Sequence, residues 1–132
     1  MSTIEQLQGL SESEDHIEFK EAKRNYPFSG GKHTDPKDRR HCVLGYIAAL
    51  ANERGGRLVL GMADRVPHTV VGSNFAENKV GELVDEIYKR LGIRVQYEEL
   101  YSDEGKRVLV LIVPSRPIGR LLKFEGVHLM RT

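Results

Sequence analysis

Hydrophobic and polar residues alternate in the stretch HIEFKEA, which begins at His16. Ile17 and Phe19 fall on one side of this pattern, and His16, Glu18 and Lys20 fall on the other, as expected for a half-buried strand. The following stretch, KRNYPFSGGKHTDP, has no periodicity and contains Gly, Pro, Ser, Asn and Asp, so we predict a loop there. Loops of this length are disproportionately functional.

Apolar residues then recur at three-and-four spacing, which predicts a helix. Asp35 and Pro36 are a good helix start, and we expect the helix to run to about Asn52. Gly55 and Gly56 are expected to end it, because a left-handed residue is tolerated most easily without a side chain. The apolar stretch RLVLGMAD after them predicts a central strand. The buried face of the helix is predicted to contain Val43, Leu44, Ile47, Leu50 and Ala51.

The second half of the chain predicts another helix and further strands. The helix is expected in AENKVGELVDEIYKRLG, closed by Gly92. Two strands with a turn from Asp103 to Gly105 follow, and then a small hairpin around Glu125 and Gly126. Together these elements predict an α/β (α+β) domain, with a mixed β-sheet of about five to six strands and two main helices packed on it. The apolar face of this second helix is predicted to hold Val80, Leu83, Val84, Ile87, Tyr88 and Leu91.

The length and composition favour one domain over residues 1–132, with a core at 12–131. Cys42 is the one cysteine, which excludes an intramolecular disulfide and favours the cytoplasm. No apolar stretch approaches the roughly 20 residues of a membrane span, and the first residues do not have the pattern of a signal peptide. We therefore expect a cytoplasmic chain that does not act in a membrane.

Charge is distributed unevenly, although the net charge is only +1. Residues 20–41 contain seven Lys or Arg against three acids, a local excess of four positive charges. Such a cluster can contact the phosphates of DNA or RNA, or it can form an ordinary solvated loop. The basic residues are Lys20, Lys23, Arg24, Lys32, Lys37, Arg39 and Arg40.

Four carboxylates form a candidate metal site. Glu12 and Glu14 precede the first predicted strand, Glu18 lies on it, and Asp64 ends the second. Oxygen ligands of this kind suit Mg²⁺ or Mn²⁺, which could support phosphodiester hydrolysis if the two strands are neighbours. The alternative is that these carboxylates are ordinary surface residues, because exposed strand positions and turn-starting Asp residues are common in any soluble domain.

Other motifs in the chain do not predict a cofactor. The stretch SGGKHT does not match a P-loop, because Tyr26 stands where a glycine is required. ATP hydrolysis is therefore not expected. The five histidines have no spacing typical of zinc ligands.

Three stretches resemble the Schlafen Alba-like domain, also called divergent AAA-4. They are ESEDHIEFKEA, YIAALANERGGRLVLGMAD with the VVG that follows, and VLVLIVPSRP. The resemblance extends from about Glu12 to Arg131. The family occurs at the front of bacterial transcriptional regulators and of RecG-related ATP-dependent DNA helicases. It implies nucleic-acid binding and a shared surface at which Glu18, Lys20, Asn52 and Asp64 gather.

Some animal Schlafens resemble metal-dependent endoribonucleases that use two glutamates and an aspartate. By position, Glu18 and Asp64 match two of these residues. The other glutamate usually lies five residues before the first match, where this chain has Ser13 between Glu12 and Glu14. This departure puts nuclease activity, with Mg²⁺ or Mn²⁺ as cofactor, in doubt.

Three functions therefore remain open. The first is a DNA- or RNA-binding domain of a regulator or helicase-like protein, the second is the metal-dependent endoribonuclease, and the third is a protein-interaction or oligomerisation module. The chain is expected to be a monomer or a homodimer. By resemblance, it could be the N-terminal part of a longer protein with a C-terminal winged-helix region.

Overall fold

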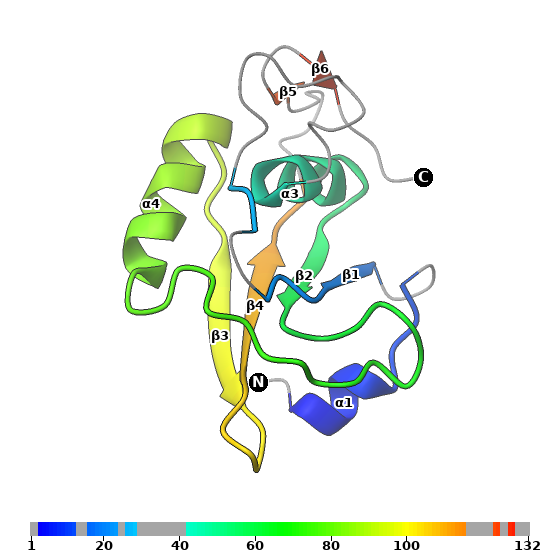
Figure 1. Ribbon diagram of the computed structural model, residues 1–132. Helices are drawn as coiled ribbons and strands as arrows, with labels where there is room; N and C mark the ends of the chain where they lie inside the picture. The colour runs from blue at the N-terminus through cyan, green and yellow to red at the C-terminus, as the bar shows by residue number, and fades with distance from the viewer. Residues whose placement is uncertain are drawn as a thin grey trace.

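The computed structural model describes residues 3–12, 16–23, 26–28 and 42–115, together with the backbone of 123–124 and 127–128. A four-stranded mixed sheet lies at the centre, in the order β1-β2-β4-β3 (Figure 1). β1 runs parallel to β2, and the other two pairs are antiparallel. The strands are β1 (Ile17–Lys20), β2 (Gly56–Leu60), β3 (Gln96–Tyr101) and β4 (Arg107–Val113).

This architecture confirms the predicted α/β class, although the main sheet has fewer strands than expected. The final predicted hairpin exists as β5 (Lys123–Phe124) and β6 (Val127–His128), which pair with each other in a separate two-stranded sheet. β5 lies against α3 (Val43–Asn52) and α4 (Val80–Leu91) instead of extending the main sheet.

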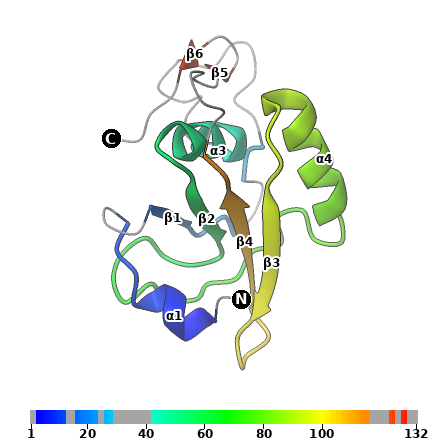
Figure 2. The same cartoon turned by 180° about the vertical axis from the view of Figure 1, so that it is seen from behind.

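The main sheet separates two hydrophobic cores. α3 and α4 cover one face, where Leu58 and Leu60 of β2 are buried. The short helix α1 (Ile4–Gln8) and the loop after β2 lie on the opposite face, as the view from behind also shows (Figure 2). Ile17 and Phe19 of β1 are fully buried in this second core. The predicted alternation of β1 is thus confirmed.

α3 begins later than the sequence predicted. Cys42 is its N-cap, with extended backbone angles (φ −145°, ψ 167°), and its Sγ accepts a hydrogen bond from the amide of Gly45 at 3.4 Å. A single helix running from Asp35 is therefore wrong, because the chain is extended at Cys42. Asp35 and Pro36 lie outside the described residues. The predicted apolar face, Val43 to Ala51, is buried as expected.

The turn from α3 to β2 is made by three consecutive residues with positive φ. Arg54 has φ 82°, Gly55 88° and Gly56 153°, so the left-handed stretch begins one residue before the glycines. A side chain at Gly55 would come within 2.6 Å of the carbonyl oxygen of Val113, and one at Gly56 would collide with that of His16. The glycines are therefore needed both for their backbone angles and because neighbouring strands approach them closely. The predicted central strand is confirmed, since β2 lies between β1 and β4.

α4 agrees with the sequence except at one residue. Gly92 follows the helix with φ 74°, in the left-handed conformation expected of a C-terminal glycine. Val80, Leu83, Ile87 and Leu91 are buried, but Tyr88 is 44% exposed. The core position predicted for Tyr88 is wrong. Its ring instead contacts the guanidinium of Arg94, 4.2 Å from the ring centre.

α1 was not predicted. Thr3 and Gln6 form a capping box, in which the Thr3 hydroxyl accepts from the Gln6 amide and the Gln6 side chain accepts from the Thr3 amide. This Thr-x-x-Gln spacing was the signal in the sequence. Leu7 is the residue that α1 buries in the second core. No helix in the described part of the chain has the length and apolar character needed to cross a membrane.

Candidate nucleic-acid interface

Glu18 and Lys20 lie together on the α3 side of edge strand β1. Because Ile17 and Phe19 face the second core, the alternation of the strand turns Glu18 and Lys20 toward α3. The Lys20 ammonium lies 3.9 Å from a carboxylate oxygen of Glu18 and 4.7 Å from the ring centre of Tyr46 on α3. The side chains of Lys20 and Glu18 are 25% and 16% exposed. Lys20 is therefore held in place while part of it remains accessible.

The surroundings of Lys20 favour its charged form. Burial acts to lower the pKa of Lys20, but a side-chain hydrogen bond with Tyr46 and the nearby charges act to raise it. The carboxylates responsible belong to Glu18 and Glu12. The net effect is a pKa raised above the ordinary value of 10.5. At neutral pH, this position thus carries a fixed positive charge.

Tyr26 and Phe75 form an aromatic pair beside the core that α3 covers. Tyr26 packs edge-on against Phe75, with ring centres 6.3 Å apart. Burial, aided by the charges of Tyr46, Cys42 and Glu18, raises the pKa of the Tyr26 hydroxyl. The Tyr26 hydroxyl therefore keeps its proton at neutral pH.

The rest of the predicted basic cluster is only partly described. Lys23 is exposed and lies 3.5 Å from the carboxylate of Glu21, which is also exposed. An exposed ion pair of this kind contributes little to stability and leaves the lysine available to a ligand. The remaining members lie outside the described residues: Arg24, Lys32, Lys37, Arg39 and Arg40.

Glu12 has a structural contact that the sequence did not reveal. Its carboxylate accepts a hydrogen bond of 2.9 Å from the backbone amide of Phe19. β1 pairs with β2 on one side only, so Glu12 satisfies an amide on the other side of this edge strand. A charge-assisted bond of this kind stabilises the strand edge.

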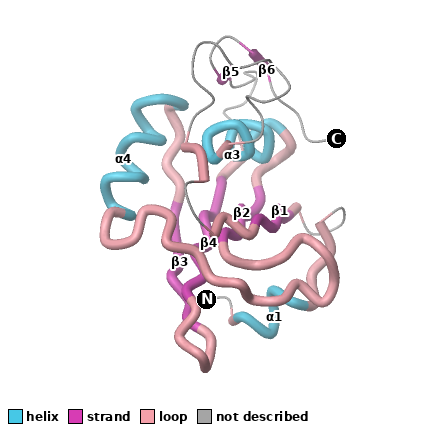
Figure 3. Tube along the Cα trace, in the orientation of Figure 1, coloured by secondary structure: helices cyan, strands magenta, loops and turns pink. Residues whose placement is uncertain are grey.

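Asp64 lies four residues beyond the last residue of β2 and is exposed. The loop after β2 crosses the face of the sheet that carries α1 (Figure 3). The strand was expected to reach Asp64, but it ends at Leu60. At Gly61 (φ 115°) the chain turns, and the Gly61 carbonyl accepts hydrogen bonds from the amides of Val71 and Gly72. Among the described residues, no three His, Cys, Asp or Glu side chains could together hold a metal ion. Glu14, the other proposed ligand, lies outside those residues.

Asn52 and Asp64 do not gather at one surface. Asn52 is buried at the end of α3, next to the turn that leads into the first residue of β2, whereas Asp64 follows its last residue. Five residues of strand separate these ends by about 13 Å at 3.3 Å per residue. Lys20 pairs with Leu60 and so lies at the Asp64 end, while Glu18 pairs with Leu58 in the middle. The turn after Asn52 and the segment that leads to Asp64 thus leave β2 at opposite ends, and the described contacts do not bring the four residues together.

His68 has a structural role that the sequence did not predict. It is 2% exposed, and its ring stacks on Phe19 with centres 3.9 Å apart. Its two ring nitrogens lie 2.9 Å and 3.1 Å from the carbonyl oxygens of Ala63 and Leu10. His68 therefore ties the loop after β2 to β1 and to the segment after α1. No local pattern in the sequence predicts this role, because it depends on contacts with distant segments.

The chain is thus an α/β domain with a mixed sheet, in which contacts with Glu18 and Tyr46 fix Lys20 on the edge strand β1. A model of the Schlafen AlbA_2 family matches residues 13–132, which is nearly the whole chain. The chain therefore belongs to the Schlafen AlbA_2 family, as the sequence motifs predicted.

A solved structure shares this fold. The crystal structure of the DIP2311 protein from Corynebacterium diphtheriae matches with a TM-score of 0.61 and 24% sequence identity. The match covers 89% of this chain but 23% of that one, so this chain spans less than a quarter of the length of its structural neighbour. A search of curated proteins gave no significant match.

Proposed function

We propose that this chain is a nucleic-acid-binding module that contacts phosphates through the β1 edge. The observation that carries the proposal is the Lys20 ammonium, which Glu18 and Tyr46 hold at a partly exposed position. A positioned cation loses less side-chain freedom on binding than a freely moving one. The chain continues from Lys20 into residues 20–41, with their excess of four positive charges.

Family membership also supports this function. The chain belongs to the Schlafen AlbA_2 family, and the sequence resemblance to that family implies nucleic-acid binding in regulators and helicase-like proteins. We therefore propose that it serves as the nucleic-acid-binding domain of a regulator or helicase-like protein. The phosphate contacts would set affinity and would make it depend on salt, without specifying a sequence.

The test is a titration with labelled single-stranded and duplex DNA and RNA at low and moderate salt. We expect binding that weakens as salt rises. Replacing Arg39 and Arg40 together by Ala should reduce the log-log salt slope for duplex DNA by up to about two units, since each lost phosphate contact removes about 0.9. The matched control is the double replacement Lys89→Ala and Arg90→Ala, which removes the same charge from exposed positions on α4.

Two results would contradict the proposal. One is an Arg39/Arg40 variant with unchanged affinity and salt slope. The other is an equal loss of affinity and salt slope in the α4 control. That result would indicate that binding depends on the net charge of the chain and not on the basic residues that follow β1.

The same titration, repeated with Mg²⁺ or Mn²⁺, tests the nuclease alternative. The binding module should leave RNA uncut with either metal. Metal-dependent cleavage that disappears in Asp64→Ala, while RNA binding survives, would instead assign the carboxylates to catalysis. Glu18→Gln provides the second test, since Glu18 is the other proposed ligand.

A further inference from the structure

The opposite edge of the sheet, formed by β3, has backbone groups that no described strand uses. β3 pairs with β4 alone, in a continuous register from Gln96 to Tyr101. The Ser102 amide donates to the Lys106 carbonyl at 2.9 Å, so this is a hydrogen-bonded pair. Because such pairs alternate along an antiparallel ladder, the backbone groups of Tyr97, Glu99 and Tyr101 point outward. This edge can accept another strand.

Side chains on β3 are also exposed. Tyr97 and Tyr101 are 46% and 61% exposed. They are among the exposed large hydrophobic residues in the described part of the chain. Proline and β-bulges are two features that prevent another strand from pairing with a sheet edge. Neither occurs in the six residues of β3. Its length, about 20 Å, is sufficient for a short peptide.

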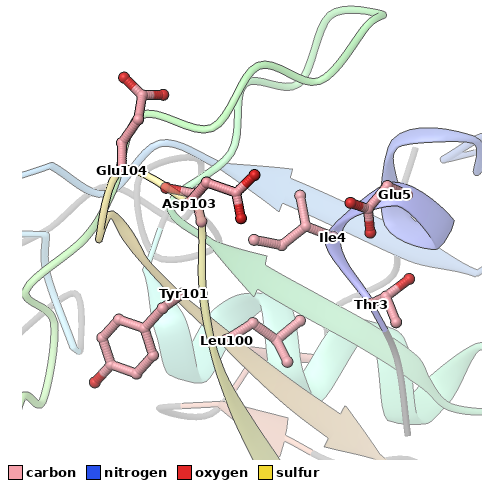
Figure 4. Close-up of a pocket in the computed structure, with 8 residues that line it drawn as sticks. Thr3, Ile4, Glu5, Leu100, Tyr101, Asp103 and Glu104 are labelled. Carbon is pink, nitrogen blue, oxygen red and sulfur yellow. The ribbon is translucent and has the colours of Figure 1, made fainter.

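A pocket of about 470 Å³ lies beside this strand, between α1 and the β3–β4 turn. Ile4 and Leu100 provide an apolar wall, and the carboxylates of Glu5 and Asp103 point toward one another across the opening (Figure 4). An apolar wall with carboxylates at its rim suits a lysine or arginine, whose aliphatic stem and charged end need these two environments. The residues that line the pocket are Thr3, Ile4, Glu5, Leu100, Tyr101, Ser102, Asp103 and Glu104.

The charge of this region indicates which partner fits. Residues 96–104 contain Glu98, Glu99, Asp103 and Glu104 and no basic residue. Glu99 is paired with Arg107 at 2.8 Å, whereas Asp103 and Glu104 are exposed in the β3–β4 turn beside the pocket. A second copy pairing antiparallel through the outward groups of β3 would place Glu99 opposite Glu99, and like charges directly opposite each other on paired strands are unfavourable. Nucleic acid is also disfavoured as the partner, because its phosphates carry the same negative charge as the acids of this segment.

From these features we propose that the β3 edge and its pocket dock an extended, basic peptide segment of a partner protein. The segment adds to the sheet as a strand through the outward groups of Tyr97, Glu99 and Tyr101. One of its Lys or Arg side chains enters the pocket and lies between Glu5 and Asp103. The exposed tyrosines supply contact area along the strand.

The experiment uses the full chain and two labelled peptides of the same length. One alternates Thr or Val with Lys or Arg, and the other has Glu at every basic position. At about 0.15 M ionic strength, the basic peptide should bind and the acidic one should not. Hydrogen exchange of the complex should show new protection at the amides of Tyr97, Glu99 and Tyr101.

Variants test the pocket separately from the strand edge. Glu5→Gln with Asp103→Asn should weaken peptide binding about tenfold or more, while Glu82→Gln with Asp85→Asn, the same charge change on α4, should have little effect. Tyr97→Pro removes an outward amide and should also weaken binding.

Four outcomes would overturn the proposal. They are equal binding of both peptides, equal losses in both carboxylate variants, binding without protection of the three amides, and a dimer of this chain that protects them without peptide.

Discussion

The two edge strands of the sheet differ in charge and in the way that their free sides are finished. β1 has four residues, its Phe19 amide is bound by Glu12, and it leads into a segment with an excess of four positive charges. β3 has six residues, outward backbone groups without a described strand partner, and acids along its length and turn. The net charge of +1 conceals this separation. The two proposals, phosphate binding at one edge and basic-peptide docking at the other, follow this difference in charge.

The largest expected effect comes from disturbing the close approach of the first residue of β2 to His16, the residue before β1. Gly56→Val adds a side chain that collides with the His16 carbonyl at a residue with φ 153°. Strain and overpacking together should lower the free energy of unfolding by about 3 kcal/mol or more, measured by urea denaturation.

The control for this change is Gly81→Ala in α4, where an added Cβ meets nothing within 4 Å. It should raise stability slightly, by about 0.5 kcal/mol. An unchanged unfolding curve for Gly56→Val would contradict the turn described above.

The next effect is expected on the β3 side, at the buried Arg107. Its guanidinium binds Glu99 and the carbonyl oxygens of Ser73 and Phe75. Arg107→Leu leaves these carbonyls without that donor and should cost about 2 to 3 kcal/mol, measured in the same denaturation experiment. Lys106→Leu, at the exposed neighbouring position, should change stability by less than about 0.5 kcal/mol. Equal effects of the two changes would show that Arg107 does not anchor this edge.

A smaller effect is expected from uncapping β1. Glu12→Ala removes the acceptor of the Phe19 amide and should cost about 1 kcal/mol. Hydrogen exchange should show faster exchange at Phe19 than at the amides that β1 and β2 share. Glu5→Ala, on the surface of α1, is the control. Unchanged exchange at Phe19 would contradict the role assigned to Glu12.

The smallest effect concerns the charge of Lys20. Its pKa is raised despite burial, mainly by the hydrogen bond with Tyr46, so Tyr46→Phe should lower it, while Tyr88→Phe should not. The resulting stability is present below pH 10.5 and is lost as the pH rises through the folded-state pKa. An NMR titration of the Lys20 side chain measures its pKa in each of the two variants. A Lys20 pKa that is the same in the two variants would contradict this contact.

The sequence predicted those parts of the fold that depend on local patterns. The alternation of β1, the buried face of α3 and the glycine after α4 follow from residue spacing and from the conformational freedom of glycine, and each was confirmed. Tyr88 was misplaced because periodicity alone does not reveal the Arg94 contact that holds its ring at the surface. α1 could have been predicted from its capping box.

The candidate site depended more on tertiary contacts. Lys20 and Glu18 could be chosen from their strand, but the Tyr46 contact requires the packing of α3 on β1. Asn52 and Asp64 could not be placed until the register of β2 showed them at opposite ends. The roles of His68 and Arg107 arise from backbone carbonyls in distant segments, and no spacing in the sequence encodes such partners.

The most direct test of the central claim is an amide NMR titration of the labelled chain with single-stranded and duplex nucleic acid at low salt. The account predicts shifts at Lys20, Lys23 and residues 24–41, which diminish as salt is added, and no shifts at Tyr97, Glu99 or Tyr101. Shifts concentrated on β3, or binding that leaves the β1 edge unchanged, would contradict it.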